Sequence, residues 1–123
     1  MAFLADYILD LALSELDTGG NRLDICSAEP TTYTQATSTL TLGNKTSLSI
    51  GAPADRSPNG RKVTVAAITD GTVTGTGTAT HWAISKTGSS VLMATGSLSA
   101  SQGVTSGNAF TLGAFDIGIP DAA

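Results

Sequence analysis

The sequence predicts a mainly β fold: a small antiparallel β-sandwich or partial barrel with one N-terminal α-helix. The 123 residues include 19 Thr, 13 Ser and 14 Gly, residue types that favour strands and turns. From residue 22 onward, apolar and polar residues alternate with the period of a half-buried strand, whereas the preceding segment has helical spacing. The strand order, and with it the choice between sandwich and barrel, stays open at this level.

The composition limits the classes of protein to which the chain can belong. Hydrophobic residues make up 41% of the chain, enough for a packed interior. Six Lys and Arg against ten Asp and Glu give a net charge of -4, and the sequence pI is about 4.5. Because such a chain repels a phosphate backbone, we expect no nucleic-acid partner.

The chain shows no sign of a membrane or secretory route. No run approaches the roughly 20 apolar residues of a membrane span. The first residues lack a basic region and are interrupted by Asp6 and Asp10, which makes a poor signal peptide. Cys26 is the single cysteine, so stability must come from core burial, oligomerisation or a partner. We therefore expect a chain made in a cytoplasm, with no membrane association.

A single domain spanning 1–123 is expected, because neither a repeat nor a second composition regime is present. Its parts are an N-terminal helix (1–20), a strand plus an extended Thr-rich arm (21–50), and a β-hairpin body (51–123).

The predicted helix covers residues 2–17, which contain no Gly or Pro and have Ile8 as their single β-branched residue before the Gly19–Gly20 stop. Its polar residues form one narrow stripe and its apolar residues cover most of the remaining circumference, which indicates burial on more than one side. The helix packs on its own sheet alone, or it also presents apolar surface to another subunit. The stripe consists of Asp6, Asp10, Ser14 and Asp17.

The first β segment is a short strand at 22–26, in which Cys26 points away from Leu23 and Ile25. Residues 31–47 read as an extended arm or loop that leads into a strand at 47–50. So few large apolar residues occur in the arm that a neighbouring subunit could order it.

The body begins with an exposed loop at 52–60 and a strand at 62–69, followed by a two-residue hairpin turn at Asp70–Gly71. Threonines then alternate along 72–80 in one continuous strand that runs on to Trp82. A second hairpin joins 79–86 to 90–97, and a loop of small residues fills 100–107. The last strand, 108–119, changes phase at Gly113, which predicts a bulge or kink. The total is about six or seven strands.

The sequence contains few residues that could form a catalytic, metal-binding or cofactor-binding site. His81 is the single histidine, and a structural or interface role fits it better than catalysis, which needs a placed partner. One His and one Cys cannot form a usual zinc site, and neither a calcium loop nor a phosphate-binding loop is present. Trp82 could stack on a sugar, although a lone Trp in a strand is usually core. We therefore expect no enzyme, no metal and no cofactor.

Three segments resemble small virion proteins of tailed bacteriophages. They run from Arg22 to Ala36 (RLDICSAEPTTYTQA), from Leu42 to Thr46 (LGNKT) and from Ala79 to Ile84 (ATHWAI). The start from Ala5 to Leu13 (ADYILDLAL) is similar to that group as well. Within the group, the chain is most similar to capsid decoration, or cement, proteins.

The resemblance implies a structural protein that binds the outer surface of a phage capsid and stabilises contacts between capsomers. It implies the major capsid protein as partner, a homo-oligomer with a trimer favoured, synthesis in the host cytoplasm and a final place on the virion exterior. Another phage structural part, such as a tail, head-tail connector or fibre-associated protein, is the alternative, followed by a small carbohydrate-binding module. The candidate interface residues are Phe3, Leu4, Tyr7, Ile8, Leu11, Tyr33, Leu40, Leu42 and Trp82.

Overall fold

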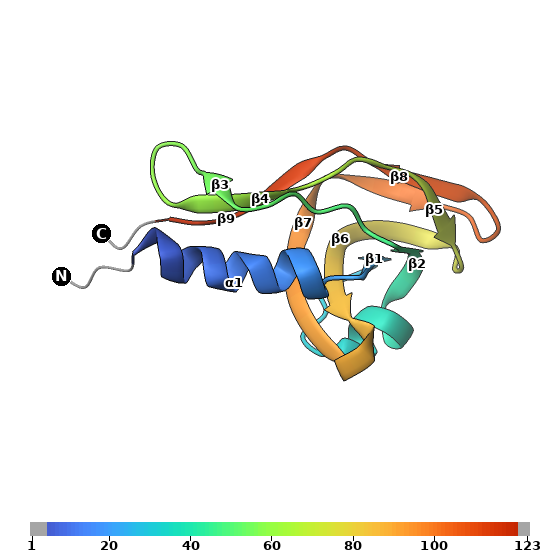
Figure 1. Ribbon diagram of the computed structural model, residues 1–123. Coiled ribbons are helices and arrows are strands. Elements are labelled where there is room, and N and C mark those ends of the chain that lie inside the picture. Colours follow the sequence, from blue (N-terminus) through green and yellow to red (C-terminus); the bar gives the residue numbers. More distant parts are fainter. Residues whose placement is uncertain (1–4, 121–123) are drawn as a thin grey trace.

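The computed structural model describes residues 5–120 as one helix, nine strands and two short helical turns (Figure 1). The helical elements are α1 (Asp6–Gly19), η1 (Gln35–Thr39) and η2 (Thr87–Ser89). The strands are β1 (Arg22–Cys26), β2 (Thr41–Thr46), β3 (Ala54–Asp55), β4 (Arg61–Val65), β5 (Ile68–Val73), β6 (Gly77–Lys86), β7 (Val91–Val104), β8 (Ala109–Leu112) and β9 (Phe115–Ile119).

The strands form two antiparallel sheets. The larger has the order β7-β6-β1-β2-β5-β8 and curls into a half-barrel, and the smaller has the order β3-β4-β9. In Figure 1, α1 lies along the smaller sheet, and its C-terminal end points at the open side of the half-barrel. The predicted mainly β fold with one N-terminal helix is confirmed, and the curled sheet makes it a partial barrel.

The main core lies between the curled sheet, the smaller sheet and α1. Leu13 and Leu16 of the helix pack with Leu23 and Ile25 of the central strand β1, whose side chains have no exposed surface. Each such buried side chain contributes about 1.5–3 kcal/mol of hydrophobic stabilisation. The helix is therefore held mainly by one leucine-rich face.

The opposite face of β1 is covered by the segment around η1. Cys26 forms a second buried cluster with Ala36 and Ala83, which places it away from Leu23 and Ile25 as the alternation predicts. Asp24 is also fully buried on β1, and its carboxylate accepts bonds of 2.8 and 3.0 Å from the Arg22 guanidinium. This pairing satisfies a charge that would be costly to bury alone.

The segment predicted as an extended arm is folded back on the sheet, so that prediction is wrong. The π-helical turn η1 closes over β1, with the Thr31 N–H and hydroxyl donating to the Gln35 amide oxygen. Strand β2 then pairs with β1. The predicted strand at 47–50 is also wrong: Ser47 has a φ of 61° and ends β2, and Ile50 makes only an isolated bridge to Val65.

The first predicted hairpin does not form. Asp70 and Gly71 lie inside β5, which pairs with β2 and β8 instead of with β4. The predicted strand 62–69 is broken after Val65, and the threonine alternation is broken between Val73 and Gly77. Pairing with distant strands determines the conformation of these residues and outweighs their local turn propensity.

The second hairpin, β6 with β7, is present. Strand β7 runs on to Val104 through most of the predicted loop 100–107. The apolar residues do change phase at Gly113, but the cause is a change of sheet and not a bulge. The chain leaves the larger sheet after β8 and enters the smaller one at β9. Nine strands therefore replace the six or seven expected.

Helix α1 ends at Gly19, two residues beyond the predicted end, because the Gly20 N–H still bonds the Leu16 carbonyl. The predicted residues 2–4 lie outside the described part. The expectation of burial on more than one side is wrong for this chain alone, since the buried residues, Leu9, Leu13 and Leu16, share one face.

Candidate interaction surface

Three of the four exposed large hydrophobic side chains of the described residues lie on α1. Tyr7, Ile8 and Leu11 are 70%, 46% and 52% exposed. The three residues fall on one side of the helix, away from the buried leucines. We call Tyr7, Ile8 and Leu11 the outer face; side chains of this kind in a group mark an interaction site more often than single exposed residues do.

An apolar groove continues this surface toward β7. It has a volume of about 410 Å³ and lies between α1, the start of β7 and the end of β9. Val91 at its rim is 45% exposed. The lining residues are Ala12, Leu13, Glu15, Leu16, Val91, Leu92, Met93, Ala94, Ile117 and Ile119. The sequence analysis missed this groove, because its walls come from three segments far apart in the chain.

Two ion pairs supplement the leucine contacts that hold α1. Asp10 accepts a 2.7 Å bond from Arg61 Nε on β4, and Arg61 also bonds Asp55. The hydrogen bond from Arg61 to Asp10 is the largest of the causes that raise the pKa of Arg61, so this guanidinium stays charged. At the other end, Lys86 Nζ lies 2.9 Å from Glu15 Oε1. Asp10 and Glu15 thus link the helix to β4 and β6, and neither pair involves the outer face.

The nine candidate interface residues do not form one surface. Phe3 and Leu4 lie outside the described residues, and Tyr7, Ile8 and Leu11 form the outer face. Three others lie around η1 and β2 and are half-buried: Tyr33, Leu40 and Leu42. Leu40 packs on the Cys26 cluster and Leu42 on the main core.

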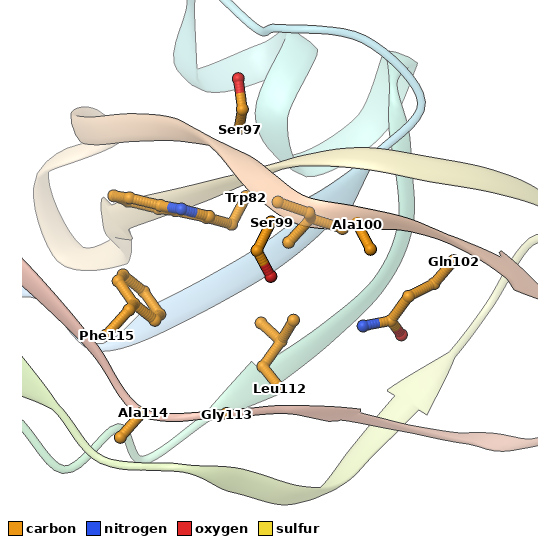
Figure 2. Close-up of a pocket in the computed structure, with 10 residues that line it drawn as sticks. Trp82, Ser97, Ser99, Ala100, Gln102, Leu112, Gly113, Ala114 and Phe115 are labelled. Carbon is orange, nitrogen blue, oxygen red and sulfur yellow. The ribbon is translucent and has the colours of Figure 1, made fainter.

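Trp82 lies in the core instead of on the surface. It is 9% exposed, and its ring centroid is 4.6 Å from that of Phe115. The two rings line a pocket of about 330 Å³ between β7 and the link from β8 to β9, which we call the seam pocket (Figure 2). Figure 2 shows Ser99, Gln102 and Leu112 around the same space. The indole therefore offers no open platform for stacking a sugar.

The surroundings of His81 do not match a hydrolytic triad. Its Nδ1 lies 2.9 Å from Thr80 Oγ1, while Ser97 Oγ and Glu29 Oε2 lie 3.4 and 3.8 Å from Nε2. In a triad the acid holds the nitrogen opposite the one that faces the serine. Here acid and hydroxyl share one nitrogen, so the ring is not oriented as a general base.

Cys26 and the side chains that could bind a metal ion are the remaining candidates for a chemical role. Burial raises the pKa of the Cys26 thiol to about 12, with the Asp24 charge as a smaller cause, and a thiol that stays protonated is a poor nucleophile. Among residues 5–120 no group of three or more His, Cys, Asp or Glu side chains could hold a metal ion.

Comparison with known proteins identifies no relative: no family model, curated protein or solved structure matches the chain. Within the described part, no helix has the length and apolar character needed to cross a membrane.

Proposed function

We propose that this protein is a structural virion protein that binds the outer surface of a phage capsid and stabilises contacts between capsomers. The observation that carries the proposal is the outer face of α1, a group of large apolar side chains left open on a helix that is otherwise firmly anchored. A protein that works by contact needs such a surface and no active site. The resemblance of the segments at 22–36, 42–46 and 79–84 to phage virion proteins supplies the context.

The partner we propose is the major capsid protein, and the place is the capsid exterior. A net charge of -4 supports the exterior, since an acidic chain is repelled by packaged DNA. Many equivalent shell sites would hold many copies, and multivalent contact compensates for a modest affinity at each one. The trimer that the resemblance implies remains a prediction of the same kind.

Copy number in purified particles tests the proposal. Quantitative mass spectrometry of virions should find this chain at a stoichiometry comparable to that of the major capsid protein, and cryo-electron microscopy should place it on the shell. A few copies per particle, confined to the tail or connector, would establish the alternative phage role. Specific glycan binding that is lost in Trp82→Ala would favour the carbohydrate-binding module.

A variant pair tests the surface itself. Leu11→Lys places a charge on the outer face, and we expect it to weaken binding to capsids that lack the protein at least tenfold, with an unchanged circular dichroism spectrum. Thr69→Lys, at an exposed position on β5, is the matched control and should bind like the wild type. Equal loss in both variants would point to general charge repulsion instead of a contact at α1.

A further inference from the structure

The outer edge of β7 is an unprotected strand edge. This strand is 14 residues long, lies at the end of the six-stranded order, and pairs only with β6. Natural sheets protect such edges with charged residues, proline or very short strands. The sequence of β7, VLMATGSLSASQGV, contains neither a charged residue nor a proline. Along this edge, no strand of the described residues pairs with its backbone N–H and C=O groups.

The opposite edge of the sheet faces β7 without pairing to it. In Figure 1, β8 and the second half of β7 run side by side to the loop that joins them, yet β8 pairs only with β5. One side-chain bond crosses the gap, from Gln102 Nε2 to the backbone carbonyl of Thr111 at 3.1 Å. The side-chain amide of Gln102 thus bonds a backbone carbonyl that a backbone N–H would bond inside a regular sheet.

Two hollows follow this edge. The groove between α1 and β7 borders Val91 to Ala94, and the seam pocket borders Ser97 to Gln102. The seam pocket is lined by no charged residue. Glu15, the charged residue of the groove, is paired with Lys86. Neutral side chains fit both hollows, and the groove between α1 and β7 is the more apolar of the two.

The seam pocket also holds an unused donor. Within residues 5–120 the indole N–H of Trp82 has no hydrogen-bond acceptor, and the fully buried side-chain atom that lacks a partner is Ser85 Oγ instead. The indole nitrogen lies against β7, since a Cβ on Gly96 would come within 2.9 Å of it. A carbonyl oxygen arriving at this edge would accept a hydrogen bond from this N–H.

We propose that the free edge of β7 binds an extended segment of a second protein, which adds a strand to the sheet and places neutral, apolar side chains in the groove and the seam pocket. Main-chain hydrogen bonds would supply affinity, and the two hollows would supply specificity. This inference goes beyond the proposed function and holds whichever protein supplies the segment.

A flexible segment fits this edge better than a second copy of the chain does. The pairing of β6 with β7 passes from Ala79–Gln102 directly to His81–Ser97, so residues 98–101 form a large bulge in β7. A bulge bends the strand and breaks the regular ladder. Two preformed β7 edges would meet at these bends and could pair only over short stretches, whereas an extended peptide can follow the bend.

The test uses the full chain and two synthetic peptides. The first alternates threonine and valine over six residues and carries a lysine at each end; the control replaces each valine by proline and keeps the charge. Because Trp82 is the single tryptophan and lines the seam pocket, its fluorescence reports occupancy directly. Isothermal titration calorimetry gives an independent affinity.

We expect saturable binding of the valine peptide and at least tenfold weaker binding of the proline peptide, which lacks the backbone donors. Ala100→Phe fills the seam pocket and should weaken valine-peptide binding at least tenfold. Ala67→Phe, at an exposed position between β4 and β5, should leave it unchanged. Thermal melting verifies folding, and the two wild-type peptide titrations remain decisive if Ala100→Phe unfolds.

Equal affinity for the two peptides, or no binding of the valine peptide, would overturn the inference. So would valine-peptide binding that survives in folded Ala100→Phe. Sedimentation velocity supplies the last outcome: self-association of the wild type that Ala100→Phe abolishes would assign the edge to a second copy and refute a foreign segment. None of these results depends on capsid binding, so the inference can fail while the proposed function stands.

Discussion

The Gly71→Ala substitution tests the most consequential difference between the sequence prediction and the structure. In the structure Gly71 lies in β5, paired with Phe110 of β8. A Cβ at this position would lie 2.3 Å from both Cε1 and Cζ of the Phe110 ring, where 3.4 Å is ordinary contact. The ring would have to move by 3.4 minus 2.3, or about 1.1 Å. Because Phe110 is 2% exposed, such overpacking costs about 1–3 kcal/mol.

Urea unfolding followed by far-ultraviolet circular dichroism measures this cost. We expect the midpoint of Gly71→Ala to fall with an unchanged m-value, the signature of a pure stability change. Gly88→Ala is the matched control, since nothing lies within 4 Å of the Cβ it would carry. Its free energy of unfolding should change by less than about 0.5 kcal/mol.

The result that refutes the reasoning comes from a double-mutant cycle with Phe110→Leu. If the ring causes the clash, Gly71→Ala should cost much less in the Phe110→Leu background, with a coupling of about 1 kcal/mol or more. The Asp70–Gly71 dipeptide is typical of a hairpin turn in which Gly71 has a positive φ. In that case Gly71→Ala destabilises the protein through the backbone, and its cost in free energy is the same in the wild type and in Phe110→Leu. An absent coupling would therefore falsify the strand register.

Three further predictions concern ionisable groups. The raised thiol pKa means that stability from neutral Cys26 is complete below its ordinary pKa of 9.0 and lost as pH rises toward about 12, so Cys26→Ala should flatten this alkaline decline in thermal melts. Hydrogen bonding by Thr64 and then Lys62 lowers the pKa of Asp116, so Thr64→Val should raise it in a carboxyl NMR titration, and an unchanged value would contradict that cause. The stability linked to Asp116 is present above its unfolded-state pKa and is lost as pH falls through the folded one. Arg22→Met should cost about 3 kcal/mol in urea unfolding because it leaves Asp24 buried without its cation, and the double variant that adds Asp24→Leu should recover part of that loss.

Local pattern was sufficient for several elements. The spacing of leucines in α1, the alternation in β1 and the β6–β7 hairpin are properties of short segments, and each element is present, although β7 runs seven residues beyond its predicted end. Tyr7, Ile8 and Leu11 were candidate interface residues on the same grounds, since the helix carries more apolar residues than one face can bury. Their exposure agrees with that reasoning.

Local pattern failed where a distant strand competes with a turn. Asp70–Gly71 has the composition of a hairpin turn, yet β2 and β8 flank that segment and hold it extended. The arm before β2 has few large apolar residues, yet it is ordered because it covers Asp24 and Cys26. Neither outcome is encoded within the segment itself, because the deciding partner lies elsewhere in the chain.

The sequence by itself determined the class of fold, the N-terminal helix and the excess of apolar residues on it, because periodicity and composition act over a few neighbouring residues. The tertiary structure alone decided which face of the helix is covered, that Trp82 is buried against Phe115, and that β7 ends the sheet with a free edge beside two hollows. Burial and edge exposure depend on the strand order, and strand order follows from pairing between distant segments whose free energies no local pattern contains.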